Sequence, residues 1–245
     1  MEEEYSVLDY ELQKLQAQGN YKKILRILEK LIKQQKENNV PFDITKNKAC
    51  DIWNIIGVKL LQEKEYEESR IYLEKALKYA ENDTLALTYN NLACYYRQKG
   101  QLRVALDYLL KVRKLEPDPV CSNMNACVVY SQLGRHEDAR DAALAAVGLL
   151  QAATLRAFVP KMNRKRGQAE GGDAESVETE FKERVANLVI WYRNLAVEYE
   201  FLKENDLSTE SYERAKDIAI DYLGEKDEIT ISVIKTYKKA LESYH

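Results

Sequence analysis

The sequence has 245 residues, with 37 basic and 40 acidic side chains and a formal net charge of −3. This near-neutral charge argues against a dedicated nucleic-acid surface, and the longest apolar runs fall far short of the ~20 residues that a membrane span requires. Nine glycines and four prolines are few for a chain with many tight turns. The opening Met-Glu-Glu-Glu-Tyr lacks the basic start and apolar stretch of a secretion signal, so we expect a cytoplasmic protein.

The first element that we expect is a helical hairpin over residues 5–37. Apolar residues at helical spacing run from Leu8 to Leu15, stop at Gly19, and resume on a second stripe. Spacings of three and four residues predict amphipathic helices. A loop is expected at residues 38–41, where two asparagines and a proline come close together.

Three copies of one pattern follow over residues 50–157. A small residue recurs at intervals of 36 and 34 residues, and a second small residue follows each one after 12 residues. An aromatic or apolar residue stands three places after the first small residue. In chain order, the first small residues are Gly57, Ala93 and Cys127, the large residues are Leu60, Tyr96 and Tyr130, and the second small residues are Ser69, Ala105 and Ala139.

This pattern resembles the tetratricopeptide repeat, a helix–turn–helix unit of about 34 residues. The resemblance implies an all-α, right-handed superhelical solenoid of antiparallel helix pairs. Small residues at the two repeated places let the helices of a pair approach closely. Gly100 and Gly134 stand where each first helix ends, in a turn that favours the left-handed conformation.

The chain then changes character over residues 158–175. This stretch has three glycines and no apolar period, so we expect a flexible insert. Its basic residues at 161–166 are interpreted as a solubilising loop, with a nuclear-import signal or a phosphate contact as alternatives.

A fifth hairpin is expected over residues 176–223, with an extended first helix. Its second helix, which carries Ser211, is expected after a turn about three residues longer than in the other repeats. A capping helix is expected over residues 228–244. Its apolar stripe would cover the open end of the solenoid, and consists of Ile231, Ile234, Tyr237 and Leu241. We therefore predict one solenoid over residues 1–245, with about five hairpins and a cap.

Asparagines recur on the first helix of several repeats, where the resemblance implies a concave groove. An amide offers one acceptor and two donors, so a row of amides can pair with the backbone of an extended peptide. The arrangement resembles kinesin-light-chain-like repeats. The alternative is that these amides only bond within the groove. The predicted peptide-binding residues are Asn54, Asn91, Asn125 and Asn194, with Gln98 and Gln132 beside them and Arg97 and Arg193 for an acidic ligand side chain.

The sequence predicts neither an enzyme nor a metal or cofactor site. It has no glycine-rich phosphate loop and no metal-ligand spacing. Glu63, Glu65, Glu67 and Glu68 are interpreted as a solvated helix face. His136 is expected to be exposed, and the four cysteines are interpreted as small buried thiols. Some tetratricopeptide domains clamp the C-terminal carboxylate of a ligand with lysine and arginine. The corresponding repeat positions of this sequence lack those cations.

We therefore expect a non-catalytic scaffold or adaptor that binds an extended or helical segment of a partner protein. Its partner would be another protein rather than a nucleic acid, a membrane or a small-molecule substrate. Two alternatives remain. The chain could be a structural subunit of a large cytoskeletal or ciliary assembly, or the regulatory arm of an enzyme complex.

Overall fold

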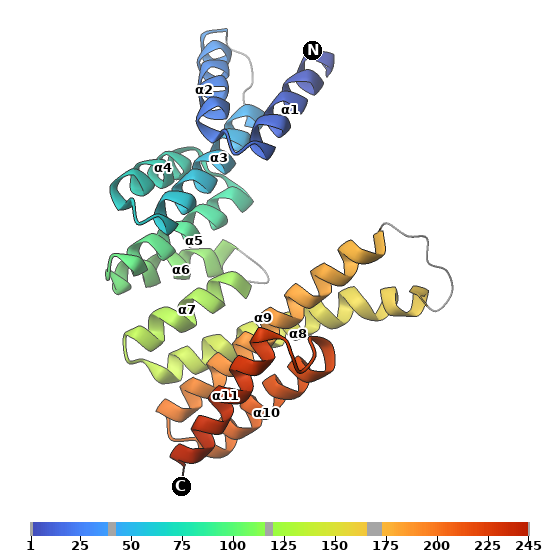
Figure 1. The fold of residues 1–245 in the computed structure, drawn as a ribbon. Helices are drawn as coiled ribbons and strands as arrows, with labels where there is room; N and C mark the ends of the chain where they lie inside the picture. The colour runs from blue at the N-terminus through green and yellow to red at the C-terminus, as the bar shows by residue number, and fades with distance from the viewer. Residues whose placement is uncertain (1, 39–42, 116–119, 166–172, 245) are drawn as a thin grey trace. The chain divides into compact units, whose positions relative to one another are not determined.

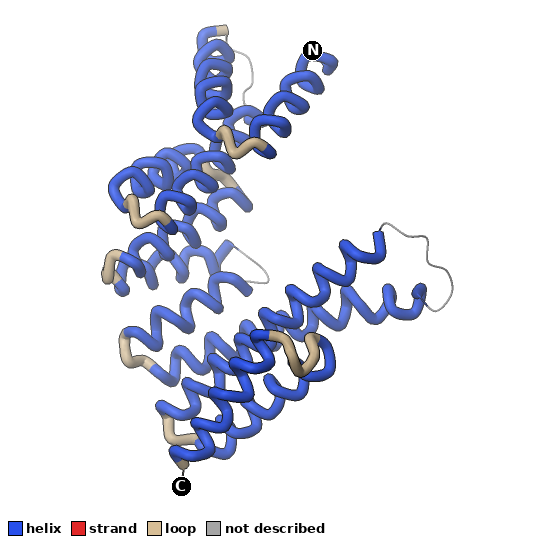
Figure 2. The backbone as a smooth tube through the Cα atoms, viewed as in Figure 1, coloured by secondary structure: helices blue, strands red, loops and turns tan. Residues whose placement is uncertain are grey.

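A computed structural model describes residues 2–38, 43–115, 120–165 and 173–244, with side chains described at 10–38, 45–115, 120–154 and 179–244. All of the regular structure in these residues is helical (Figure 2). The chain divides into two compact units, unit 1 at residues 1–117 and unit 2 at residues 118–245. The single solenoid expected over residues 1–245 stays a prediction.

Unit 1 contains three helical hairpins in chain order (Figure 1). Within it, α2 packs on α3, α4 packs on α5, and the first helices of two successive pairs, α3 and α5, also touch. Unit 1 is therefore a stack of hairpins. Its helices are α1 (Glu2–Ala17), α2 (Tyr21–Glu37), α3 (Asp43–Gln62), α4 (Tyr66–Tyr79), α5 (Asn82–Gln98) and α6 (Leu102–Leu115).

Unit 2 contains two hairpins and one further helix. Here α8 packs on α9, and the last helix packs on both α10 and α9. The last helix thus packs on both helices of the fifth hairpin, as α5 packs on both helices of the second. The helices of unit 2 are α7 (Val120–Gln132), α8 (His136–Lys165), α9 (Asp173–Phe201), α10 (Asn205–Tyr222) and α11 (Glu228–Ser243).

The same three-residue turn joins the two helices of all five hairpins. At the third turn, for example, Gly100 N–H donates to the carbonyl of Arg97 (3.0 Å) and Gln101 N–H donates to the carbonyl of Tyr96 (2.8 Å). These two bonds satisfy carbonyls at the end of the first helix, and they require a central residue with positive φ. The central residues are Gly19, Lys64, Gly100, Gly134 and Lys203, with φ between 61° and 73°.

The helices of a hairpin approach most closely where the sequence places its small residues. A Cβ added to Gly57 would lie 2.7 Å from Leu73 Cδ2, so any larger residue there would force Leu73 to shift. One helical turn from Leu73, Ser69 Oγ donates to the carbonyl of Gly57 at 2.7 Å. In the fifth hairpin, Ser208 Oγ donates in the same way to the carbonyl of Ala196, at 3.0 Å.

Two expectations for the fifth hairpin and the segment before it are corrected, the first by this bond and the second by the helix bounds. The hydroxyl that meets Ala196 belongs to Ser208, twelve residues later, so the turn has ordinary length and is not three residues longer. The flexible insert expected over 158–175 is also wrong in part. Residues 158–165 continue α8 and residues 173–175 belong to α9, whereas 166–172 lie outside the described residues. Most of the loop predicted at 38–41 lies outside them too.

Asp227 caps the start of α11, and its side chain accepts the backbone N–H of Ile229 at 2.9 Å. It turns Thr230, Val233 and Ala240 toward α9 and α10. Of the stripe predicted to cover the open end, Tyr237 packs on Tyr212 of α10, whereas Ile231 is 54% exposed.

The turns give a direct test of backbone strain. A side chain in the left-handed region costs about 1 kcal/mol, a cost that glycine avoids. We expect Gly100→Ala to lower the free energy of unfolding of unit 1 by about 1 kcal/mol, and Lys64→Gly to raise it by a similar amount. Nothing lies within 4 Å of a Cβ at residue 100, so sterics with neighbours do not contribute.

Urea unfolding followed by Trp53 fluorescence measures both effects, in a Trp191→Phe background so that only unit 1 is reported. Changes of the same sign in the two variants would contradict this account of the turn.

Candidate functional site

In unit 1, a buried chain of side-chain hydrogen bonds joins α3 and α5, the first helices of the second and third hairpins. Asn54 Nδ2 donates to the carbonyl of Cys50 at 3.1 Å and to Thr88 Oγ1 at 2.9 Å, and Thr88 donates onward to the carbonyl of Thr84 at 2.7 Å. Asn91 Nδ2 donates to Asn54 Oδ1 at 2.9 Å. Because a carbonyl can only accept, Asn54 must turn its NH₂ toward Cys50 and its oxygen toward Asn91. The bonds therefore fix the orientation of the Asn54 amide.

The Asn54 side chain is therefore held inside unit 1. It is only 2% exposed and its donors and acceptor are already paired inside unit 1. This arrangement favours the alternative that the Asn54 amide bonds only within the groove. Asn91 is 9% exposed and is held by Asn54 through its NH₂ group. Such a buried amide pair ties α3 to α5 and orients Asn91.

The other predicted site residues lie in different settings. Gln98 is exposed at the end of α5, and Arg97 is half-buried on the same helix. In unit 2, Gln132 is exposed at the end of α7, and Asn125 of α7 and Asn194 of α9 are half-buried. Arg193 Nη1 donates to Ser232 Oγ of α11 at 3.5 Å, so it contributes to the contact between α9 and α11. The role of these residues in peptide binding stays a prediction.

A hollow of about 320 Å³ opens in unit 1 between α1, α2 and α3. We call it the α1–α3 hollow. Its apolar walls are Leu12, Ile24, Leu28, Ile52 and Ile55, and its polar rim is Gln13, Gln16, Lys48 and Asp51. The hollow therefore combines apolar walls with amide and charged groups, the composition typical of a recognition site.

Ile55 of α3 is the link between this hollow and the predicted groove. It lines the hollow, and it stands next to Asn54 on the helix whose amide chain reaches α5. Partial burial raises the pKa of Asp51, one turn earlier. A ligand that brings an N–H group or a cation to this carboxylate would compensate for that burial. The sequence analysis missed the hollow, because its walls come from three helices and follow no single periodic pattern.

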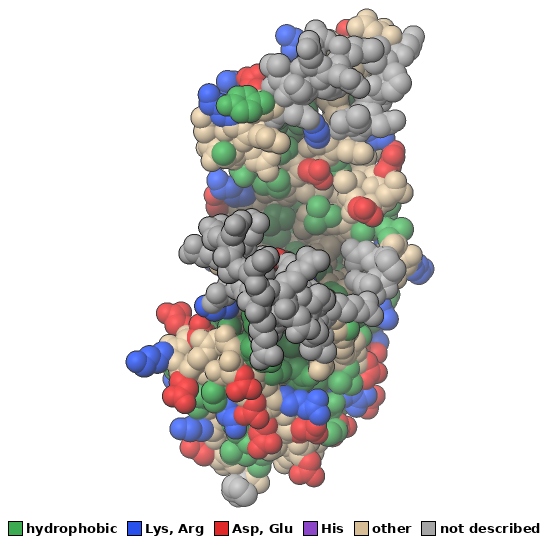
Figure 3. Space-filling view, turned by 90° about the vertical axis from the view of Figure 1, so that its right-hand side faces the viewer, with side chains coloured by type: hydrophobic (Ala, Val, Ile, Leu, Met, Phe, Trp, Pro, Cys, Tyr) green, Lys and Arg blue, Asp and Glu red, His purple; other side chains and the backbone are tan. Residues whose placement is uncertain are grey.

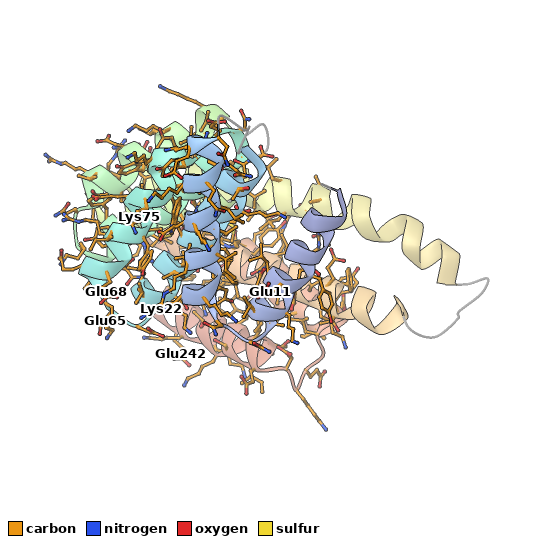
Figure 4. The ribbon with its side chains drawn as sticks, turned by 90° about the horizontal axis from the view of Figure 1, so that it is seen from above. Glu11, Lys22, Glu65, Glu68, Lys75 and Glu242 are labelled. Atoms are coloured by element: carbon orange, nitrogen blue, oxygen red, sulfur yellow. The ribbon has the colours of Figure 1, made fainter. Side chains whose placement is uncertain are left out.

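Glu63, Glu65, Glu67 and Glu68, predicted to form a solvated helix face, are all exposed. Glu65 and Glu68 project from the start of α4, and Lys75 lies further along that helix (Figure 4). Lys75 forms an ion pair with Glu29 of α2 at 3.6 Å. In the lower part of the face drawn in Figure 3, acidic and basic side chains are interspersed. No group of three or more His, Cys, Asp or Glu suited to a metal ion occurs among the described residues.

His136 differs from its sequence-based expectation. Its side chain is 22% exposed, and its Nδ1 lies 2.8 Å from Oε2 of the buried Glu198. Its ring stacks on Phe201, with centroids 4.1 Å apart. Since Glu198 and Phe201 belong to α9, His136 joins the start of α8 to α9. The expectation of an exposed histidine was wrong because it considered only the residues next to His136 in the sequence.

These features define an all-α protein built from stacked helical hairpins. Residues 48–115 match the family model of the tetratricopeptide repeat. This stretch therefore contains tetratricopeptide repeats, as its sequence pattern indicated. Repeats of this family generally serve as scaffolds for protein interaction rather than as catalysts. No helix in the described part of the chain has both the length and the apolar character needed to cross a membrane.

Solved structures with this fold include the TPR-like repeats of a protein described as a kinesin light chain from Podospora anserina. The two chains are 16% identical, the TM-score is 0.59, and the match covers 78% of this chain and 85% of that one. BtubC from P. vanneervenii is 15% identical, with a TM-score of 0.48 and coverage of 89% and 94%. At these identities the first match indicates the fold alone. No curated protein shows a significant sequence match.

Removing the Asn54 amide should destabilise unit 1. In Asn54→Ala, the NH₂ of Asn91 and the hydroxyl of Thr88 lose a buried partner, which costs about 2 kcal/mol. Asn47→Ala is the matched control, because Asn47 lies on the same helix but is exposed. Urea unfolding in the Trp191→Phe background measures both variants. Equal stabilities would show that the amide chain contributes nothing.

The thiols should differ in reactivity. Burial, and then the charge of Glu198, raise the pKa of Cys127 to about 12, and burial raises the pKa of Cys50 as well. Cys121, by contrast, is exposed. Because the thiolate is the reactive form, iodoacetamide at about pH 8 should label Cys121 in the folded protein and the two buried thiols only after unfolding. Peptide mass spectrometry reads the labelling, and rapid labelling of Cys127 in the folded protein would contradict its burial.

Proposed function

We propose that this chain is a non-catalytic protein-interaction scaffold and that unit 1 binds an extended or helical segment of a partner protein. The segment lies along the first helices of the hairpins and places an apolar side chain in the α1–α3 hollow. The observation that carries the proposal is the hollow itself, a preformed apolar recess of about 320 Å³ with a polar rim.

The rim supplies the groups that would hold the backbone of the segment. Gln13 and Gln16 of α1 are exposed and offer amide donors and acceptors. Asp51, on the exposed rim, offers a carboxylate acceptor for a donor of the ligand. Asn91 contributes on α5, where Asn54 fixes the position of its amide. Binding therefore uses the amides of the rim for the backbone and the apolar walls for one side chain.

The experiment introduces a charge into the hollow. Ile55→Glu places a carboxylate against apolar walls, and Ile71→Glu makes the same change on α4 at a side chain that is 50% exposed and outside the hollow. Each tagged protein is incubated with cell extract, cross-linked through lysines and analysed by mass spectrometry. We expect cross-links between Lys48 and a partner to fall about tenfold with Ile55→Glu and to persist with Ile71→Glu.

Circular dichroism first establishes that both variants are folded. If the Lys48 cross-links persist unchanged with Ile55→Glu, the hollow does not hold the partner and the proposal fails. Asp51→Lys, on the exposed rim, provides a second variant that should weaken the same cross-links without altering the apolar walls.

A further inference from the structure

Unit 2 contains a second hollow, flanked by the second helices of its two hairpins, α8 and α10. It lies over α9 between α8 and α10 and has a volume of about 320 Å³. We call it the α8–α10 hollow. The residues that matter here are Leu144, Val147 and Gly148 of α8, Leu195 of α9, and Leu207 and Arg214 of α10. It is separate from the α1–α3 hollow, because all of its walls belong to unit 2.

The apolar side chains at the edges of this hollow are unusually exposed. Leu144 is 44% exposed and Leu207 is 43% exposed, and they come from the two helices that flank α9. Val147 and Leu195 below them are buried. A helix in a soluble protein normally turns polar residues to solvent. Exposed leucines around an apolar recess therefore mark a surface that buries apolar groups of a ligand.

Gly148 gives an independent indication that this volume is kept open. Glycine is less favourable than alanine inside a helix, so an interior glycine needs a reason. At Gly57 the reason is close packing, since an added Cβ would touch Leu73. A Cβ added at Gly148 meets nothing within 4 Å. Among the side chains of unit 2 that the structure describes, none accounts for the glycine, whereas a ligand that enters the hollow would.

The charges beside the hollow indicate the chemistry of that ligand. Arg214 is paired with Glu210 at 2.6 Å, and Lys216 is paired with Asp217 at 3.3 Å. The carboxylates of α10 outnumber its cations by five to two. The five are Asp206, Glu210, Glu213, Asp217 and Asp221, and the two are Arg214 and Lys216. Of these, only Glu210 and Arg214 line the hollow, and Glu213 accepts a hydrogen bond from Tyr237 of α11. The remaining carboxylates of α10 favour a ligand with positive charges flanking its apolar anchor.

We propose that the α8–α10 hollow binds a basic amphipathic helix of a partner protein. One apolar side chain of that helix fills the space above Gly148, between Leu144 and Leu207. Its lysines and arginines lie against the carboxylates of α10. This would be a second docking surface, independent of the one proposed for unit 1, so that the chain could hold two partners together.

The test uses a fluorescent peptide of about 18 residues, long enough for about five helical turns. The peptide carries leucine on one face and lysine elsewhere, and a second peptide carries glutamate in place of lysine. Anisotropy titrations at about 0.15 M salt compare the two. We expect the full chain to bind the lysine peptide at least about tenfold more tightly than the glutamate peptide.

Two leucine substitutions in α8 distinguish binding in the hollow from nonspecific hydrophobic binding. Gly148→Leu fills the hollow and should weaken binding of the lysine peptide about tenfold. Ala145→Leu adds the same side chain on the same helix, outside the hollow, and should change the affinity less than about twofold. Asp217→Lys with Asp221→Lys keeps the hollow but changes the net charge of α10 from −3 to +1, and should also weaken binding.

Several results would overturn the proposal. The lysine peptide could fail to bind, bind no better than the glutamate peptide, or bind Gly148→Leu as tightly as the unaltered chain. Sedimentation velocity provides the remaining check. If the chain dimerises and Gly148→Leu abolishes the dimer, then a second copy of the chain occupies the hollow, and the proposed partner helix is wrong.

Discussion

The close approach of the two helices in each hairpin is the constraint on which the rest of the structure depends. Gly57 leaves room for Leu73, and Ser69 donates a hydrogen bond to the backbone at the same point. The three-residue turn closes the pair at a fixed register. Once the pairs have this register, α3 and α5 come side by side, and Asn54 can meet both Thr88 and Asn91. The amide chain is thus a consequence of the backbone packing.

The sequence predicts the hairpins well because sterics leave few options at the contact points. A residue opposite Leu73 must be small, and its spacing of 12 residues from Ser69 follows from the length of the turn. The fifth hairpin was harder to place. Its turn has Lys203 where a glycine would mark the left-handed residue. Without a glycine to mark the turn, its length was overestimated. The backbone hydrogen bonds at Lys203 match those at Gly100.

The site residues were predicted less well, because a helix position fixes the direction of a side chain only approximately. Asn54 and Asn91 differ by one place in their repeats, and the packing of α3 against α5 buries both of them in one hydrogen-bonded pair. The same uncertainty placed Ile231 on the covering face of α11, where Thr230 and Val233 are the buried residues. Hollows are harder still to foresee, since they arise where side chains from three helices leave space.

The two hollows lead to a different account of recognition from the one that the asparagine pattern suggested. A row of amides is informative only if the amides are available, and the best-placed one is used up inside unit 1. Apolar volume that the protein leaves unfilled is a stronger sign of a ligand, because protein interiors are otherwise closely packed. The rim of the α1–α3 hollow is amide-rich, whereas α10 beside the other hollow is acidic. Surfaces of such different character select different partners, and a scaffold joins proteins only if its docking surfaces discriminate between them.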